Sequence, residues 1–471
     1  MKLNELTIDQ AQEGLFRGDF SSVELVRACL ARIKKADSRI KAFITVCEKK
    51  ALNQAREADQ QLRKGIKKRL LGIPVAFKDL FVTEGIKTTA GSQVLADFIP
   101  QYDATVVRRF KEAGAIVVGK TNLDAWGHGS SGENSAFGAT RNPWNQEYVP
   151  GGSSSGSGAA LAAGMCLAAT GTDTGSSIRL PASFCNLVGM KNTYGRVSRF
   201  GVIAMASSFD CPGCLTKTVK DQAAILEIIS GQDGADATMP DQKVPDYSRI
   251  LSQETGSLKI GLPKEYFNRG IDNEVGDLVK KAIRKIIDLS GGEIIPVSLP
   301  HTKYAMPCYY ILVPSEISSN LARYDGIRYG RGRDKFGDEA KRRIMLGTYA
   351  LSAGYYDAFY LKAQKIRTLI KRDFEKVFSK VDVIMAPTSP TLPFKLGEKT
   401  NDPLAMYLSD ILVCPVNIAG IPALNLPVGF SKNGLPVGMQ IIGSQFSEEK
   451  LLRIGYTYEQ ATEWYKIKPK I

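Results

Sequence analysis

Apolar and polar residues follow one another along the chain in patterns that predict helices and strands in alternation. Apolar residues at helical spacing begin directly after Thr7 and after Ser21 or Ser22, which are residues suited to cap a helix. The elements predicted for the first third are helices at 8–16, 23–33, 48–64 and 103–112, a helix starting at 122–126, strands at 41–46 and 115–118, and an apolar run at 71–81.

The same pattern continues to the end of the chain. It predicts a small-residue helix at 159–164 and a helix at 273–289, buried or paired strands at 165–169, 258–262 and 293–297, and a closing amphipathic helix at 451–463. This alternation predicts an α/β fold with a central mixed, mostly parallel sheet flanked by helices. Because no long linker interrupts it, we expect residues 1–471 to form a single domain. Its predicted regions are a helical N-terminal part at 1–66, a core at 67–230 and further sheet and helix layers at 231–471.

Composition narrows the class of protein. The net charge of +14 is compatible with proximity to nucleic acid and equally with a general solubility charge. The chain contains no run of about 18 apolar residues, so we expect no membrane span. The first residues lack the apolar core and cleavage site of a signal peptide and are acidic where a transit peptide is basic. We therefore expect a cytoplasmic protein.

Several motifs that suggest other chemistry are weak. Cys211 and Cys214 form a single CxxC without a second pair, which does not favour a zinc site. Residues 114–121 satisfy the P-loop pattern, but its four middle positions are strand formers, so the sequence favours a strand over a phosphate cradle. Of the two histidines, His128 and His301, only His128 lies in a polar loop suited to a catalytic site. A hydrolase with so little histidine needs another base, and lysine is the obvious one.

Residues 149–181 carry the strongest chemical signal. A Gly/Ser loop at 151–158 and a second Gly/Ser turn at 171–177 flank apolar, strand-like sequence, which argues against a flexible linker. Glycines allow backbone N–H groups to point at one spot, where a phosphate or a developing oxyanion could be held. Lys78 lies inside an apolar run, where a lysine either snorkels to the surface or is buried for a purpose.

The sequence PGGSSSGSGAALAAG, followed by GTDTGSSIRLPASFCNLVGMKNTYGRVSR, resembles the amidase signature family. The resemblance implies a Ser-Ser-Lys triad, in which Ser177 is the nucleophile, Ser153 a bridging residue after a cis peptide bond, and Lys78 the base. It also implies backbone stabilisation of an oxyanion by Thr174, Gly175 and Ser176. The region 67–230 then corresponds to the catalytic signature, and no metal or cofactor is expected in this chain.

Segments beyond the core narrow the resemblance to one branch of the family. Residues 307–329, 340–360, 407–410 and 415–422 are similar to the glutaminase A subunits of tRNA-dependent amidotransferases. This similarity implies that glutamine is hydrolysed to supply ammonia for amidation of Glu-tRNA(Gln) or Asp-tRNA(Asn). It implies that Arg343 and Asp410 pair with the α-carboxylate and α-ammonium of glutamine, and that Tyr309 or Tyr310 supplies an aromatic contact. It also implies B and C partner subunits, with ATP, Mg and tRNA bound mainly by the B subunit.

Two departures and two alternatives accompany this interpretation. Ser155 and Ser176 stand where the family usually has glycine, and residues 330–339 form a shorter segment than is usual in this branch. A stand-alone amidase acting on small or aryl amides is the main alternative, and a catalytically inactive assembly subunit is another. We also expect burial to lower the pKa of Lys78, with help from Arg179 if its charge lies near.

Overall fold

One mixed sheet runs through the protein. The computed structural model describes residues 2–471 except 268–269, 325 and 327–329. Its eleven described strands are ordered β1-β3-β2-β4-β6-β5-β10-β11-β9-β7-β8. The strands are β1 (Phe43–Val46), β2 (Pro74–Lys78), β3 (Ile116–Thr121), β4 (Ala168–Thr172), β5 (Val188–Lys191), β6 (Pro212–Thr216), β7 (Lys259–Pro263), β8 (Glu293–Val297), β9 (Val383–Pro387), β10 (Ala423–Phe430) and β11 (Pro436–Ile442).

Strand directions confirm part of the predicted fold class. The described parallel pairs are β2–β3, β2–β4, β7–β8 and β7–β9. The described antiparallel pairs are β1–β3, β4–β6, β5–β6, β5–β10, β10–β11 and β9–β11. The sheet is therefore mixed, as predicted, but the prediction that it is mostly parallel is wrong. Strands buried on both faces read as continuous apolar runs, so their sequences do not reveal the direction of their neighbours.

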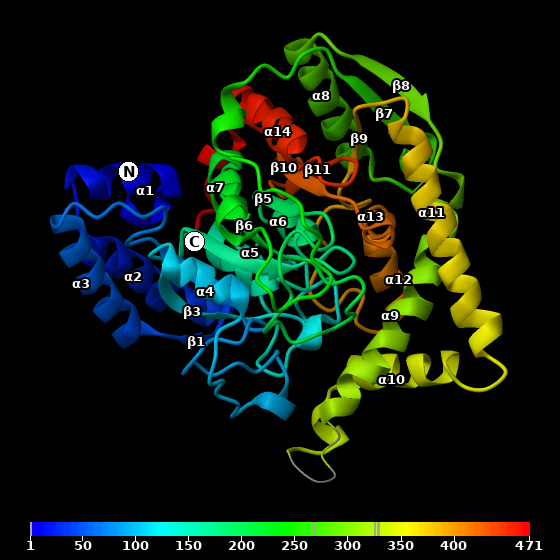
Figure 1. Ribbon diagram of the computed structural model, residues 1–471, viewed down its shortest axis with the longest axis horizontal. Helices are drawn as coiled ribbons and strands as arrows, with labels where there is room; N and C mark the ends of the chain where they lie inside the picture. Colours follow the sequence, from blue (N-terminus) through cyan, green and yellow to red (C-terminus); the bar gives the residue numbers. More distant parts are fainter. Residues whose placement is uncertain (1, 268–269, 325, 327–329) are drawn as a thin grey trace.

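Helices surround this sheet. They are α1 (Ile8–Arg17), α2 (Ser22–Ile40), α3 (Glu48–Arg63), α4 (Thr105–Glu112), α5 (Ser155–Ala162), α6 (Arg179–Phe184), α7 (Val219–Ile229), α8 (Asn273–Ser290), α9 (Ala305–Leu321), α10 (Asp338–Ala350), α11 (Lys362–Phe378), α12 (Pro403–Tyr407), α13 (Cys414–Ala419) and α14 (Glu448–Thr462). In Figure 1 the N-terminal helices α1–α3 lie at one edge of the molecule, and α9, α10 and α11 lie at the opposite edge. The mixed sheet with its surrounding helices confirms the predicted α/β class.

Local capping explains why the first helices begin where they do. The Thr7 side chain accepts from the backbone N–H of Gln10, whose side chain accepts from the Thr7 N–H in return. Ser21 and Glu24 form the same reciprocal pair at the start of α2. Each pair satisfies two backbone donors that a helix start leaves open, which stabilises the helix by about 1 kcal/mol. The predicted caps at Thr7 and Ser21 are confirmed.

The elements predicted at 165–169 and 122–126 differ from the observed ones. The strand predicted at 165–169 is observed as Ala168–Thr172, because Gly171 and Thr172 continue the strand that was expected to end in a turn. The helix predicted to start at 122–126 is wrong, since only a short 3₁₀ turn, Ala125–Gly127, forms there. Asn122 Nδ2 donates to the carbonyls of Lys41 and Gly138, so its side chain binds loop backbone and does not cap a helix.

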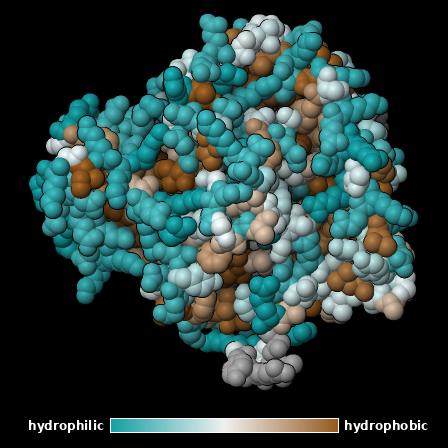
Figure 2. All heavy atoms as spheres, viewed as in Figure 1, coloured by the Kyte–Doolittle hydropathy of each residue, from teal (hydrophilic) through white to brown (hydrophobic). Residues whose placement is uncertain are grey.

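The core and surface follow the hydropathy of the chain. One large cluster of buried apolar residues extends from α1 to α14, and a second lies among α2, α3, α5 and α6. Figure 2 shows a mostly hydrophilic face with scattered hydrophobic side chains. No helix within the described residues has the length and apolar character needed to cross a membrane.

Candidate active site

Strand topology explains why Lys78 meets the second Gly/Ser turn. Lys78 is the last residue of β2, and β2 runs parallel to β4 with Val75 opposite Ala168. Parallel neighbours end at the same edge of a sheet, so the residues that follow each strand lie close together. The turn after β4 begins at Asp173, which places residues 173–177 beside the side chain of Lys78.

Lys78 is fully buried and hydrogen-bonded to two hydroxyls. Its Nζ donates to Ser153 Oγ and to Thr172 Oγ1, each at 2.8 Å. Burial disfavours the ammonium and lowers the pKa of Lys78 from 10.5 to about 7, although the charges of Asp124, Asp173 and Asp210 oppose the shift. A substantial fraction of Lys78 is therefore neutral near pH 7 and able to accept a proton. The prediction of a lowered pKa is confirmed, but Arg179 is not among its causes.

The turn that carries Ser153 has an unusual backbone. The Gly152–Ser153 peptide bond is cis, as the family resemblance implied. Gly151 has φ of 79°, a left-handed conformation that favours glycine, and Pro181 backbone atoms lie where a side chain would otherwise project. Ser154 then begins the approach to α5, which starts at Ser155, earlier than the predicted start at Ala159.

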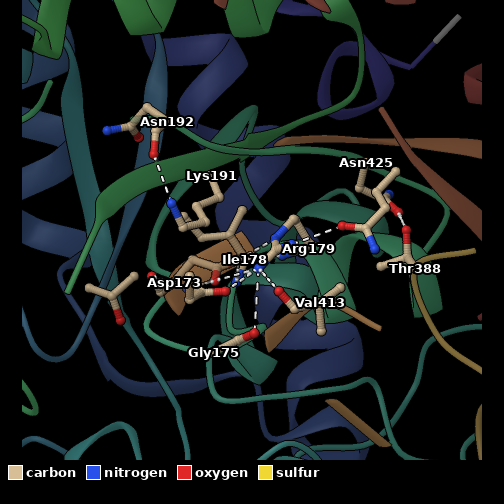
Figure 3. A network of polar contacts seen from close by, with 12 residues as sticks. Asp173, Gly175, Ile178, Arg179, Lys191, Asn192, Thr388, Val413 and Asn425 are labelled. Atoms are coloured by element: carbon tan, nitrogen blue, oxygen red, sulfur yellow. Dashed lines mark hydrogen bonds and ion pairs between the residues drawn. The ribbon is translucent and has the colours of Figure 1, made fainter. Parts of the chain in front are cut away.

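A buried ion pair fixes the second turn. Arg179 Nε donates to Asp173 Oδ2 at 3.0 Å, and Arg179 Nη2 donates to Asp173 Oδ1 at 3.1 Å. The same guanidinium donates to the carbonyls of Gly175 and Val413, and Figure 3 shows these contacts converging on it. Asp173 Oδ2 also accepts the N–H groups of Ile178 and Arg179 at 3.2 Å. Both ends of the turn are thus tied to one buried charge pair.

The backbone of this turn presents donors. Within the described part of the chain, none of the N–H groups of residues 174–177 donates a hydrogen bond. Such a row of N–H groups is suited to an oxyanion. The Thr174 side chain donates to Asp210 Oδ1 at 2.7 Å, which fixes the middle of the turn.

Ser177 lies at the end of the turn, against the Ser153 segment. The Ser154 N–H donates to the Ser177 carbonyl at 3.2 Å, and Ser177 is 5% exposed. No hydrogen bond of the described structure uses the Ser177 hydroxyl. The structure thus brings Lys78, Ser153 and the turn of Ser177 together, with a direct contact between Lys78 and Ser153.

A cavity of about 400 Å³ is lined by Asp124 and Ser130, which hydrogen-bond to the Ser153 turn, and by Arg343, the predicted cation. Arg343, on α10, is buried and donates from Nε to Glu339 Oε1 at 2.7 Å. Its guanidinium lies 5.4 Å from the ring of Tyr310 and 5.7 Å from the ring of Tyr407. These two rings stack with centroids 3.9 Å apart and hold the guanidinium at the cavity.

Asp410 supplies a carboxylate near the same cavity. Its Oδ2 accepts from Ser130 Oγ at 2.5 Å, while its buried Oδ1 has no partner among the described residues. Burial raises the pKa of Asp410 to about 6, and the hydroxyls of Ser130 and Ser176 act against this shift. Ser176 therefore faces this carboxyl.

The two candidate tyrosines occupy different places. Tyr309 is buried, and its hydroxyl lies so close to Gly175 that a Cβ there would be 2.8 Å from it. Tyr310 instead lies under Arg343. Tyr309 therefore contacts the turn of the serine, whereas Tyr310 contacts the cation.

The weaker motifs have structural explanations. Residues 116–121 form β3, and Lys120 Nζ lies 2.9 Å from the buried carboxylate of Asp79, so this lysine has its own partner. Cys211 and Cys214 are buried free thiols. His128 is buried at the cavity wall, and burial together with the charge of Arg343 lowers its pKa well below 6.5.

Several residues of the site escaped sequence reasoning. Thr172 accepts a hydrogen bond from Lys78, and Asp124 donates one to the Ser153 segment. Glu339 and Tyr407 both contact the guanidinium of Arg343. The sequence signal available for Asp124 was a carboxylate three residues after a buried strand. Glu339 stands four residues before Arg343, which is the spacing of an ion pair on one helix face.

Comparisons with known proteins identify the family of this chain. The family model described as amidase matches residues 24–452. The chain is 53% identical over 486 aligned residues to the A subunit of the glutamyl-tRNA(Gln) amidotransferase from Moorella thermoacetica, across 100% of this chain and 99% of that protein. It is 52% identical to the protein of the same name from Geobacter metallireducens, across 100% of both. The crystal structure of the Thermotoga maritima protein of that name superposes with a TM-score of 0.84 at 43% identity, over 98% of this chain and 95% of that one. The chain belongs to the amidase family, as the resemblance of its two serine turns indicated.

Proposed function

We propose that this chain is the glutaminase subunit of a tRNA-dependent amidotransferase. The observation that carries the proposal is the buried contact of 2.8 Å between Lys78 Nζ and Ser153 Oγ, beside the turn of Ser177. The full-length likeness to proteins named as amidotransferase A subunits supports the narrower activity. Glutamine hydrolysis to glutamate and ammonia would be the reaction of this chain.

The proposed reaction begins with proton transfer. Neutral Lys78 accepts the proton of Ser153, which accepts the proton of Ser177 as Ser177 Oγ attacks the side-chain amide carbon of glutamine. The N–H groups of Thr174, Gly175, Ser176 and Ser177 stabilise the oxyanion, by about 2.7–4 kcal/mol for each donor. The proton returns to the amide nitrogen, ammonia leaves, and water hydrolyses the glutamyl ester.

The proposed substrate contacts use opposite charges at the cavity. Arg343 would bind the α-carboxylate of glutamine, because its guanidinium can make two parallel hydrogen bonds to a carboxylate. Asp410 would accept a hydrogen bond from the α-ammonium through its unpartnered Oδ1. Tyr309, over Gly175, would pack beside the reacting amide. A simple amide lacks both charges and would leave these groups unpaired.

The proposal extends to partners, location and domain organisation. Ligation of ammonia to an aminoacyl-tRNA requires an activated carboxyl, so a B subunit would bind ATP, Mg and tRNA, and a C subunit would stabilise the assembly. A cytoplasmic location goes with this role. We propose one domain for residues 1–471, with regions 1–66, 67–230 and 231–471. The continuous sheet from β1 to β8 supports it.

Glutamate release provides the first test. The purified chain, alone and co-purified with the products of neighbouring genes, is incubated with glutamine, acetamide or benzamide. Glutamine is expected to be the preferred substrate, and the complex with ATP is expected to amidate misacylated tRNA. A preference for acetamide or benzamide would support the stand-alone amidase instead. A complete complex that amidates tRNA with added ammonia but hydrolyses no amide would support an inactive assembly subunit.

A further inference from the structure

Asp124 is a buried carboxylate that the proposed reaction leaves without a role. It is fully buried, three residues beyond β3. Its Oδ1 accepts the N–H groups of Gly132 at 3.1 Å and Asn134 at 3.0 Å, and its Oδ2 accepts the Gly132 N–H at 2.9 Å. No cation contacts it among the described residues. A buried carboxylate is costly unless it is hydrogen-bonded or paired, and here backbone N–H groups, not a cation, offset that cost.

The same residue contacts the segment that carries Ser153. The Asp124 N–H donates to the Ser153 carbonyl at 3.2 Å. Asp124 Oδ2 lies so close to Gly152 that a Cβ at that position would be 2.0 Å from it, and a Cβ at Gly129 would be 2.5 Å from Asp124 Cγ. The carboxylate is therefore held between two glycine backbones, one of them in the turn of the bridging serine.

The loop that binds Asp124 also reaches the substrate end of the cavity. The Gly152 N–H donates to the Ser130 carbonyl at 2.8 Å, and Ser130 Oγ donates to Asp410 Oδ2 at 2.5 Å. A displacement of residues 129–134 would thus move both the Ser153 turn and the partner of Asp410. Asp124 accepts from two N–H groups at the far end of this loop.

We propose that Asp124 is a positioning residue that joins the Ser153 turn to the substrate loop, and that its negative charge stabilises Lys78 when Lys78 carries the proton taken from Ser177. The second part rests on the proposed function. Of the charges that favour the Lys78 ammonium, that of Asp124 acts most strongly, followed by those of Asp173 and Asp210. Asp173 is already paired with Arg179. Burial raises the pKa of Asp124 to about 7, with Glu133 acting in the same direction and Lys78 against it, so the carboxylate and the amine compete for one proton near neutrality.

The test is the variant Asp124→Asn, which keeps the size of the side chain and removes its charge. Two readouts are measured between pH 5.5 and 9: glutamine hydrolysis, and labelling of the serine nucleophile by a fluorophosphonate, which needs no glutamine. The plateau rate is expected to fall up to about 100-fold, because the turn of the bridging serine is displaced. The pH limb, which is the range over which each rate rises with pH, is expected to move to lower pH in both readouts. Loss of the negative charge lowers the pKa of Lys78, which causes this shift.

Two further variants separate the effects. Asp221→Asn is the matched control, because Asp221 is also a buried carboxylate that accepts two backbone N–H groups, from Ile8 and Asp9, and its charge does not act on Lys78. It is expected to leave the pH limb in place. Ser130→Ala keeps Asp124 and removes the hydrogen bond to Asp410, so it is expected to raise KM for glutamine without moving the limb.

The outcomes are distinguishable. A limb of Asp124→Asn that stays at the wild-type pH would overturn the proposal, whether or not the plateau falls. If Asp124→Asn does not fold, Asp124→Ser is measured, because its smaller side chain fits between the two glycines, and the same criterion applies. If the wild type is labelled by the fluorophosphonate but hydrolyses no glutamine, the proposed function fails, and the labelling limb alone decides the role of Asp124.

Discussion

Replacement of Lys78 by methionine is expected to abolish activity and to stabilise the protein near neutral pH. Lys78 has a pKa of about 7 in the folded protein and an ordinary value of 10.5 when exposed. At pH 7 the folded state therefore binds fewer protons than the unfolded state, and this difference costs about 4 kcal/mol of stability. Lys78→Met removes that cost together with two hydrogen bonds, to Ser153 and Thr172, worth about 1 kcal/mol each. The variant should be more stable by about 2 kcal/mol at pH 7.

The pH dependence has a fixed sign. Because the folded pKa lies below the unfolded one, the cost of burying Lys78 is largest below pH 7 and fades as the pH rises toward 10.5. Wild-type stability should rise relative to that of the variant by about 1.4 kcal/mol per pH unit in this range, and the two proteins should be equally stable at about pH 9. Lys78→Met keeps the apolar stem of the side chain, so packing changes little.

Melting temperatures and urea midpoints of both proteins, measured from pH 6 to pH 9.5, check this prediction. Glutaminase activity is measured in parallel. A stability difference that does not change with pH would refute the buried, neutral lysine. A Lys78→Met variant that keeps most of its activity would show that the base lies elsewhere, with His128 as the next candidate.

Three further outcomes follow from the same geometry. Ser177→Ala should lower the rate of glutamate release by several orders of magnitude, and near-normal turnover would contradict its role as nucleophile. Arg343→Ala should raise KM for glutamine much more than it lowers kcat, as steady-state kinetics would report. The rise of kcat/KM with pH should have its midpoint near pH 7 and persist in His128→Gln, because burial and Arg343 lower the pKa of His128 well below 6.5. Loss of that limb in His128→Gln would contradict the assignment of Lys78.

Local patterns allowed most elements to be predicted. The helix observed at Ile8–Arg17 was expected at 8–16, and the strand Glu293–Val297 was expected with the same bounds. In the helix, the spacing of apolar residues and the Thr7 cap agree with the local structure, and in the strand the β-branched residues favour an extended backbone. The proposed triad could be predicted because its residues stand in a recognisable order along the chain.

Features that depend on distant contacts could not be predicted. Tyr310 and Tyr407 lie almost a hundred positions apart in the sequence, yet their rings stack and both contact the guanidinium of Arg343. The position of Asp124 after a buried strand did not reveal its contacts, because these depend on N–H groups of a loop that folds back on it. The prediction of a mostly parallel sheet was wrong for a related reason, since the antiparallel pairing of β4 with β6 is decided by packing of the whole sheet.

The charges around Lys78 explain how one site could hold a neutral amine and later its ammonium. Asp173 is neutralised by Arg179, and its two oxygens are occupied by that guanidinium and by backbone N–H groups. Asp124 and Asp210 have no such cation among the described residues, and burial raises the pKa of Asp124 to about 7 and of Asp210 to about 6. Before reaction, desolvation keeps much of Lys78 neutral. Once Lys78 takes a proton, these two carboxylates lie ready to balance its charge without any movement of solvent. A lysine placed among apolar groups alone would have a still lower pKa and be more fully neutral, but no carboxylate would stabilise its ammonium once it took a proton.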